Sequence, residues 1–291
     1  MSKQAYASNL FKNIFAAKKE RRFMKNKVVV ITGGSSGIGK ALAEQFGMNG
    51  SKIVITGRKK EALDQAELEL QKKKIDVLTI VSDVSKEEDN KQMVDAILEH
   101  YGKIDILINN AGISMRAMFE DLDLDVVKKV MDINFYGALY ATKYCLPYII
   151  QGKGTVVGIS SIAGYRGLPA RTGYSASKFA LQGFLEVLRT EMLYKGVNVL
   201  TACPGFTTSN IRRTALAADG SQQGESPRDE SNMMSAEECA EYIYNAVKRR
   251  KKILILTNMG KLTVWLNKLF PVFMDKMTYK VMAKEANAPM K

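Results

Sequence analysis

The chain has 291 residues, of which 46% are hydrophobic and 25% charged, so it can bury a core and is not expected to be disordered. Its one histidine, His100, excludes zinc sites that need two histidines, and its three cysteines have no CxxC spacing, so we expect reduced thiols and no metal site. The net charge of +13 lies at the ends: residues 1–27 carry +7, residues 248–291 carry +9 and the part between carries −3. A near-neutral middle argues against nucleic-acid binding.

The first segment, residues 1–26, is predicted to be a basic amphipathic arm. Its apolar residues, such as Leu10, Phe11 and Ile14, recur at helical spacing among lysines and arginines. The arm contains no apolar run of signal-peptide length, and the chain contains no stretch of about 20 apolar residues. We therefore predict neither a secretory signal nor a membrane-spanning helix.

From residue 27 onward, short β-branched runs alternate with stretches of helical length. We predict strands at 28–31, 53–55, 77–80, 106–108, 156–159, 197–200 and 253–256. We predict helices at 37–48, 60–73, 86–100, 123–150, 174–194 and 236–249. Because the strand runs are apolar throughout and helices follow them, the sequence predicts an α/β fold, a doubly wound parallel β-sheet of the Rossmann type over residues 27–258.

A glycine-rich turn follows the first predicted strand and opens the first predicted helix. It reads Thr32-Gly33-Gly34-Ser35-Ser36-Gly37-Ile38-Gly39. Its glycines permit a tight turn and a close approach of the backbone to a ligand, and the helix N-terminus offers free N–H groups to a pyrophosphate. The turn is therefore interpreted as a dinucleotide site rather than a plain strand–helix corner.

The second predicted strand is followed by Arg58, with Lys59 and Lys60 behind it. An NAD site commonly has an acidic residue at this point to bind the ribose 2′-hydroxyl. A guanidinium instead suits a 2′-phosphate, so Arg58 favours NADP(H) over NAD(H). The alternative is that these three cations are solvated side chains at the start of a surface helix.

Tyr174 and Lys178 are four residues apart in a predicted helix and therefore share one of its faces. An ordinary phenol has a pKa of about 10, and a neighbouring ammonium favours its phenolate form. A tyrosine beside a lysine is thus a candidate proton donor to a carbonyl oxygen.

Residues 206–234 interrupt the alternation, because they include few large apolar residues and many Ser, Gln and Asp. The segment follows a strand end, where ligands bind in sheets of this kind, so we interpret it as a lid. A disordered surface insertion is the alternative.

Residues 259–291 form a predicted C-terminal helical extension that is both apolar and basic. Pro271 divides it into two short helices, with Trp265 before the proline and Phe273 after it. Neither helix could span a bilayer, but both could lie at an anionic membrane surface. The alternative is that the extension packs on the body or across a dimer.

Six motifs occur in one order along the chain: Thr32-Gly33-x-x-x-Gly37-x-Gly39, Asn109-Asn110-Ala111-Gly112, Asn134, Ser160-Ser161, Tyr174-x-x-x-Lys178 and Pro204-Gly205. In order and spacing they resemble the short-chain dehydrogenase/reductase family over residues 27–258. The glycine-rich turn and the segment around Tyr174 are also similar to 3-ketodihydrosphingosine reductases and related lipid ketoreductases. The resemblance implies a Rossmann-type fold and a dinucleotide-dependent oxidoreductase.

The resemblance also implies four catalytic residues. Tyr174 matches the general acid/base, and Lys178 matches the lysine that binds the nicotinamide ribose and lowers the pKa of the tyrosine. Ser161, thirteen residues before Tyr174, matches the serine that hydrogen-bonds the substrate carbonyl. Asn134 matches the asparagine that holds a water of a proton relay.

Cofactor contacts are implied in the same way. Asp83, followed by Val84, matches the acid that meets the adenine, and the backbone of Asn109 lines the adenine ribose. Thr207 and Ser209 stand where the family commonly has Ile or Val, and Thr, and both keep hydrogen-bonding groups. The predicted cofactor-binding set is Gly33, Ser35, Ser36, Gly37, Ile38, Gly39, Arg58, Asp83, Val84, Asn109, Ala111, Gly112, Tyr174, Lys178, Pro204, Gly205, Thr207 and Ser209.

Together these features predict an NADPH-dependent reductase that interconverts a ketone and a secondary alcohol, with the tail favouring a lipid or long-chain substrate. The alternative is a dinucleotide-sensing binding protein on the same fold without turnover, although Tyr174 and Lys178 are both present. We expect a homo-oligomer that is cytoplasmic, partly bound to anionic membranes, and without a nucleic-acid partner.

Overall fold

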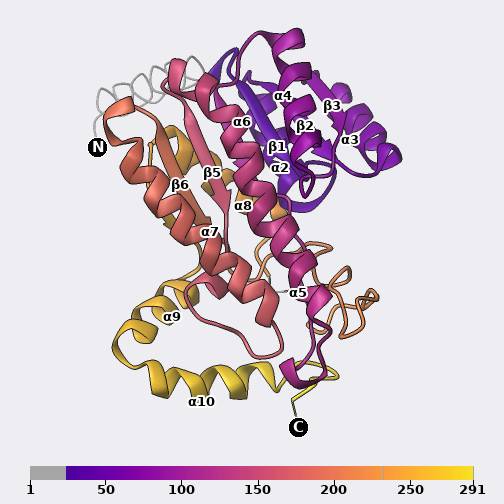
Figure 1. Ribbon diagram of the computed structural model, residues 1–291, viewed down its shortest axis with the longest axis vertical. Coiled ribbons are helices and arrows are strands. Elements are labelled where there is room, and N and C mark those ends of the chain that lie inside the picture. The colour runs from indigo at the N-terminus through magenta and orange to yellow at the C-terminus, as the bar shows by residue number, and fades with distance from the viewer. Residues whose placement is uncertain (1–23, 232, 291) are drawn as a thin grey trace, which may run out of the picture.

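The computed structural model describes residues 24–231 and 233–290, so most of the predicted arm 1–26 lies outside the described residues. Seven strands form one parallel sheet in the order β3-β2-β1-β4-β5-β6-β7 (Figure 1). The strands are β1 Val28–Thr32, β2 Lys52–Gly57, β3 Val77–Val81, β4 Ile106–Asn109, β5 Thr155–Ile159, β6 Asn198–Cys203 and β7 Ile253–Ile255. This architecture confirms the predicted doubly wound parallel sheet.

The winding direction of the sheet reverses beside β1, which pairs with β2 on one side and with β4 on the other. Val30 of β1 is in register with Val54 and with Leu107. Parallel sheets of this kind bind ligands at the carboxyl ends of the strands beside such a switch point. The glycine-rich turn after β1 and Asn109 at the end of β4 both lie at this edge.

Two layers of helices cover the sheet because alternate strand residues face opposite sides. Val29 and Ile31 lie in a core with α2 (Gly37–Met48), α3 (Lys60–Lys72) and α8 (Ala236–Lys248). Val28 and Val30 lie in a second core with α4 (Glu87–Tyr101), α6 (Gly137–Gln151) and α7 (Thr172–Glu191). Figure 1 is viewed from the side on which α6 and α7 cover the sheet.

The single helix predicted over 123–150 is divided in the structure. α5 (Leu124–Met131) continues through a π-helical turn, Asp132–Tyr136, into α6. Hydrophobic spacing does not predict a π-helical turn. Such turns interrupt α-helices locally and are often found at functional sites. Asn134 lies within it and is only 1% exposed. Short 3₁₀ helices occupy Phe119–Asp121, Ile162–Gly164 and Leu193–Lys195.

Segment 206–234 packs against the body of the protein in a third apolar cluster. Leu216 is buried there with Met115 and Val126. The backbone N–H of Arg116 donates to the carbonyl of Leu216 at 2.7 Å. The described part of the segment thus has a defined place beside the loop after β4, which does not support a disordered insertion. Its opening as a lid stays a prediction.

Two short helices follow β7, namely α9 (Asn258–Leu269) and α10 (Pro271–Met282). Pro271 lies in the first turn of α10, where the backbone N–H groups have no partner within the helix, so a proline costs no hydrogen bond there. The predicted division of the tail into two helices is confirmed. Both helices lie beyond the carboxyl ends of β5 and β6, at the lower end of Figure 1. Of the helices described, none combines the length and the apolar character that a membrane crossing requires.

Candidate active site

Tyr174 and Lys178 lie in the first two turns of α7, at the carboxyl edge of the sheet. Their spacing places the Lys178 Nζ 5.7 Å from the centre of the Tyr174 ring. The Lys178 Nζ donates a hydrogen bond of 2.9 Å to the carbonyl of Ile159, the last residue of β5. The predicted pair therefore faces the end of a central strand.

Lys178 is 4% exposed, and its burial has a strong electrostatic effect. Because the charged ammonium loses its water of solvation, the pKa of Lys178 is lowered to about 8. The lysine can consequently exchange a proton near neutral pH, which an ordinary surface lysine does not do.

The phenol of Tyr174 forms a hydrogen bond with the hydroxyl of Ser161, which follows β5. The Ser161 Oγ also accepts a hydrogen bond of 3.1 Å from the N–H of Ala163 and so caps the 3₁₀ helix Ile162–Gly164. These contacts hold the two hydroxyl groups together at one point, and the catalytic roles that the resemblance implied for them stay predictions.

Burial raises the pKa of Tyr174, whereas the hydrogen bond from Ser161 and the charges of Arg171 and Arg212 oppose that rise. The net direction is upward, so the phenol is held in its protonated form. This differs from the expectation that Lys178 lowers the pKa of the tyrosine, because desolvation of the phenol is the larger effect.

Asn134 is held by three hydrogen bonds of its side chain. The Oδ1 accepts from the N–H of Ile113 at 2.8 Å, and the Nδ2 donates to the Ile113 carbonyl and to the Ser177 Oγ, each at 2.9 Å. A Cβ added at Gly112 would lie 3.1 Å from the Asn134 Oδ1 and 3.5 Å from the Lys178 Nζ. Asn134 therefore orients the loop after β4 beside Lys178, and its role in holding a relay water stays a prediction.

The glycine-rich turn is held closely against the end of β4. Gly33 and Gly37 have φ angles of +65° and +52°, which glycine adopts without strain. A Cβ at Gly39 would lie 2.3 Å from the carbonyl oxygen of Gly33. The turn thus leaves a space that a side chain would fill, which we call the glycine cradle, and α2 begins within the turn at Gly37 with its first N–H groups free.

Thr32 and Asn110 lock this turn in place, a role that the spacing of the motifs does not disclose. The Thr32 Oγ1 accepts hydrogen bonds of 3.1 Å from the N–H groups of Asn110 and Ala111. The Asn110 Nδ2 donates to the carbonyls of Thr32 and Gly33 at 3.0 and 2.9 Å. These four hydrogen bonds join the end of β1 to the end of β4 and fix the position of the glycine-rich turn.

The predicted adenine-side residues lie at the ends of β3 and β4. Asp83 accepts hydrogen bonds from the N–H and the hydroxyl of Ser85, at 3.1 and 2.7 Å. The Asn109 Nδ2 donates to the Thr142 Oγ1 at 2.9 Å, while the buried Asn109 Oδ1 has no partner within the described residues. An unpaired buried acceptor beside an open glycine cradle fits a dinucleotide at this edge.

Arg58 directly follows β2 and is exposed. A Cβ at the neighbouring Gly57 would lie 3.6 Å from the Ser35 Oγ, so Arg58 stands beside the glycine-rich turn. Lys60 differs from it, because the Lys60 Nζ pairs with Asp64 at 2.7 Å. Arg58 forms no ion pair with any of the described residues, 24–231 and 233–290.

Beyond β6, Pro204, Gly205, Thr207 and Ser209 complete the edge. Thr207 is 4% exposed, and its hydroxyl donates to the Gly205 carbonyl at 3.4 Å. The position of a Cβ at Gly37 would be 3.5 Å from the Cβ of Ser209, so this loop meets the glycine-rich turn. The structure thus brings the predicted cofactor and catalytic residues to one edge of the sheet.

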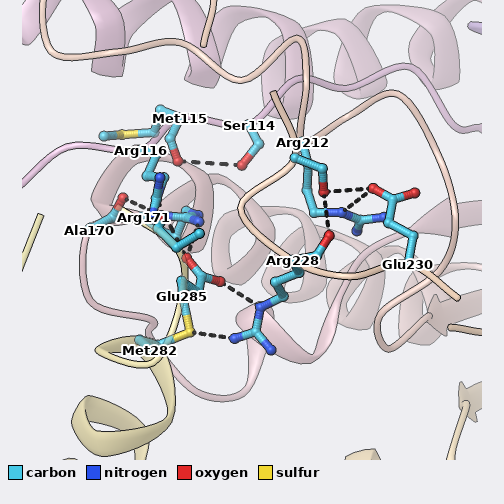
Figure 2. A network of polar contacts seen from close by, with 12 residues as sticks. Ser114, Met115, Arg116, Ala170, Arg171, Arg212, Arg228, Glu230, Met282 and Glu285 are labelled. Carbon is cyan, nitrogen blue, oxygen red and sulfur yellow. Dashed lines mark hydrogen bonds and ion pairs between the residues drawn. The ribbon is translucent and has the colours of Figure 1, made fainter. Parts of the chain in front are cut away.

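A cluster of charged residues lies next to this edge, and no local pattern in the sequence indicates it. Figure 2 shows the Glu285 carboxylate between Arg116, Arg171 and Arg228. The Arg171 Nη2 and the Arg228 Nε donate to it at 2.9 and 2.6 Å, and the Arg116 Nε lies at 3.5 Å. We call these four residues the Glu285 cluster.

The Glu285 cluster joins separate parts of the chain. Arg116 lies after β4, Arg171 directly precedes α7, Arg228 belongs to segment 206–234, and Glu285 follows α10. Burial lowers the pKa of both Arg116 and Arg171, and the charge of Glu285 opposes that effect. The carboxylate therefore compensates cations that would otherwise be costly to bury.

Arg212 connects segment 206–234 to the carboxyl edge of the sheet, which carries the predicted catalytic residues and which we call the catalytic edge. Its Nε donates to the Glu230 carboxylate at 2.9 Å (Figure 2). Its Nη2 donates to the carbonyl of Thr207, also at 2.9 Å. The charge of Arg212 is one of those that oppose the raised pKa of Tyr174. This segment thus contributes electrostatically to the site.

Cys145, Cys203 and Cys239 are buried free thiols. Burial raises the pKa of each thiol to about 12, which makes them unreactive. Among the described residues there is no cluster of three or more His, Cys, Asp and Glu side chains that could hold a metal ion.

Comparison with known proteins agrees with this geometry. Residues 27–220 match the family described as short chain dehydrogenase. Dehydrogenase/reductase SDR family member 7B of Mus musculus is 35% identical over 279 residues, which cover 94% of this chain and 85% of the mouse protein. Dehydrogenase/reductase SDR family protein 7-like of Drosophila melanogaster is 33% identical over 278 residues, covering 94% and 84% of the two chains.

Solved structures that share the fold include two with a bound dinucleotide. A short-chain dehydrogenase/reductase from Burkholderia phymatum in complex with NAD has a TM-score of 0.78 at 23% identity, covering 86% of this chain and 96% of that chain. Alcohol dehydrogenase from the archaeon Thermococcus sibiricus, complexed with 5-hydroxy-NADP, has a TM-score of 0.71 at 24% identity, covering 80% and 96%. Since these two neighbours hold different dinucleotides, their likeness does not select the cofactor.

The sequence relatives carry other names than 3-ketodihydrosphingosine reductase, so they give no support to that narrower resemblance. The broader resemblance is confirmed by the family match over residues 27–220 and by the parallel sheet with its glycine cradle. This chain belongs to the short-chain dehydrogenase/reductase family of NAD(P)-dependent oxidoreductases.

Proposed function

We propose that the chain catalyses the NADPH-dependent reduction of a ketone to a secondary alcohol, and the reverse oxidation, with Tyr174 as the proton donor. The observation that carries this proposal is the hydrogen bond between the hydroxyl groups of Ser161 and Tyr174. Two such groups at one point can both donate to a single carbonyl oxygen and stabilise the negative charge that develops on it. The bound dinucleotide supplies the hydride.

The electrostatics of the site favour reduction at neutral pH. Because the pKa of Tyr174 is raised, its phenol remains protonated and can give its proton to the alkoxide oxygen. Lys178, with a pKa lowered to about 8, stands one helical turn away and can return a proton to the tyrosine. The resemblance also gives Lys178 the role of holding the nicotinamide ribose.

The choice of NADPH rests on Arg58. This exposed guanidinium stands beside the glycine-rich turn with no ion pair to a described residue, so it is available to a 2′-phosphate. An arginine binds such a group through two parallel hydrogen bonds. The acidic side chain that would favour NAD is absent from this position of the sequence.

The surroundings of Tyr174 favour a ketone with an apolar substituent. The tyrosine packs against the cluster of Met115, Val126 and Leu216, together with the partly exposed Ile113. An apolar group next to the reacting carbonyl would bury its surface against these side chains. The proposed substrate class is therefore an apolar ketone, with long-chain members included in the test.

The test assays the purified chain with NADPH against ketones of increasing chain length. We expect turnover that falls about a thousandfold in Tyr174→Phe and about a hundredfold in Ser161→Ala, with NADPH binding close to normal in both. Tyr194→Phe is the matched control, since Tyr194 is 97% exposed. If NADPH binds but no ketone is reduced by the wild type, the chain is a dinucleotide-binding protein and the proposal is wrong.

A further inference from the structure

The C-terminal helices α9 and α10 are attached to the body of the protein along one side. Val264, Met274 and Met282 are buried there, between 2% and 8% exposed. The Asn267 Nδ2 donates to the carbonyl of Tyr165 at 2.9 Å, and Asp275 forms an ion pair with Arg166. The tail therefore packs on its own subunit, as one of the two alternatives predicted, but it does so with only part of its surface.

The remaining surface of the two helices is strongly apolar. The large side chains that are exposed on it include Leu262, Trp265, Leu269, Phe270, Phe273 and Met277, and we call these six the tail apolar surface. Trp265 is 56% exposed and Phe273 is 57% exposed. Large apolar side chains gathered on the exposed side of a helix pair are typical of a contact with a protein or a membrane.

Uncompensated positive charge accompanies this surface. Residues 258–284 contain five lysines and one acidic residue, Asp275, and that carboxylate is already paired with Arg166. Within the described chain, none of Lys261, Lys268, Lys276, Lys280 and Lys284 forms an ion pair. The ligand of this surface must therefore offer both apolar material and negative charge.

We propose that the tail apolar surface docks the protein onto an anionic lipid bilayer. A second copy of the chain would not neutralise the lysine charges, because a twofold contact would place the lysines of one copy against those of the other. Lysine is also depleted in protein interfaces. At a bilayer the aromatic rings enter the headgroup region while the lysine stems extend to the lipid phosphates. This inference does not depend on the proposed reaction.

The length of the helices determines how they lie on the bilayer. Each helix has 12 residues, which corresponds to about 18 Å, against a hydrocarbon core of about 30 Å. The two helices must therefore lie in the plane of the headgroups. Because a Cβ at Gly260 of α9 would lie 2.8 Å from Ile162, which follows Ser161, docking would turn the catalytic edge toward the lipid.

The test is co-sedimentation of the full chain with vesicles, either of phosphatidylcholine alone or of equimolar phosphatidylcholine and phosphatidylglycerol. We expect binding to the anionic vesicles only, weakening as salt is added. Since each lysine near such a surface strengthens binding about fivefold, Lys268→Glu/Lys276→Glu/Lys280→Glu should weaken it more than a hundredfold. Trp265→Ser/Phe273→Ser should weaken it about tenfold.

Matched controls place equivalent changes elsewhere in the chain. Lys72→Glu/Lys74→Glu/Lys195→Glu makes the same change in charge at exposed sites, and Tyr194→Ser removes an aromatic side chain that is 97% exposed. Every variant keeps residues 1–26, so a loss of binding specific to the tail variants is assigned to the tail. Equal binding by tail variants and controls would overturn the proposal. So would a wild type that ignores anionic vesicles and forms a dimer that Trp265→Ser/Phe273→Ser dissociates.

Discussion

The carboxylate of Glu285 accepts a hydrogen bond of 2.9 Å from the Arg171 guanidinium across 114 residues of sequence. Arg171 directly precedes the helix that carries Tyr174, and Glu285 follows the last helix of the tail. This ion pair therefore connects the C-terminal extension to the start of the helix that carries Tyr174. Arg228 links segment 206–234 to the same carboxylate at 2.6 Å.

Glu285→Gln should lower the free energy of unfolding by about 3 kcal/mol, because it leaves buried arginines without their counter-charge. The side chain of Glu285 is only 3% exposed, so water cannot take over its role. Urea denaturation measures the effect. Glu241→Gln on the exposed face of α8 is the control and should change stability by less than about 0.5 kcal/mol. A change in Glu285→Gln no larger than the control's would show that the Glu285 cluster contributes little to stability.

Lys178 should make the stability of the protein without cofactor depend on pH. Below about pH 8 the lysine is charged in both the folded and the unfolded chain, so folding carries the full cost of burying the charge. Between about 8 and the ordinary lysine value of 10.5, the folded chain has lost the proton while the unfolded chain keeps it. The free energy of unfolding must therefore rise with pH in this window.

Lys178→Met tests this contribution, because it removes the titrating ammonium from the buried position. At pH 7 the variant should be more stable than the wild type by about 3 kcal/mol, and the difference should shrink as the pH rises toward 10. Denaturant titrations at several pH values measure it. A difference that does not vary with pH would contradict the lowered pKa of Lys178.

Arg58→Asp should reverse the preference between the two cofactors. Loss of the charge-assisted contacts weakens NADPH binding about ten- to a hundredfold, while the new carboxylate can accept the ribose 2′-hydroxyl of NADH. Dissociation constants for both dinucleotides measure the change. Lys72→Asp, at the far end of α3, makes the same change in charge and should leave the ratio as it is. Equal affinities for both cofactors in the wild type would contradict the role of Arg58.

Gly39→Ala should weaken NADPH binding at least about tenfold and lower stability, because its Cβ would meet the Gly33 carbonyl oxygen at 2.3 Å and displace the turn. Gly183→Ala is the opposite case. Gly183 lies in α7, and apart from the backbone of its own helix no atom of the described structure lies within 4 Å of its Cβ position, so alanine should stabilise the helix by up to about 1 kcal/mol. Calorimetry of unfolding and of NADPH binding tests both. Similar effects of the two substitutions would contradict the cradle.

Features that depend on neighbours a few positions away could be predicted from the amino-acid sequence. The parallel strands follow from short apolar runs, and the glycine-rich turn follows from residues 32–39. The spacing of Tyr174 and Lys178 places them on one helical face. Asn134 and Ser161 have no such local pattern, and only the resemblance to a family identified them.

Contacts between segments that are far apart in the sequence could be identified only in the folded chain. The Glu285 cluster joins Arg116 to Glu285, which are 169 positions apart along the chain. Arg212 reaches the catalytic edge from segment 206–234, for which the sequence allowed either a lid or a disordered insertion. The upward shift in the pKa of Tyr174 likewise follows from the burial of the phenol, and not from the adjacent Lys178. Local periodicity determines which face of a helix or strand is apolar. Burial and charge pairing depend on which other elements cover that face, and the packing of the whole chain decides which elements those are.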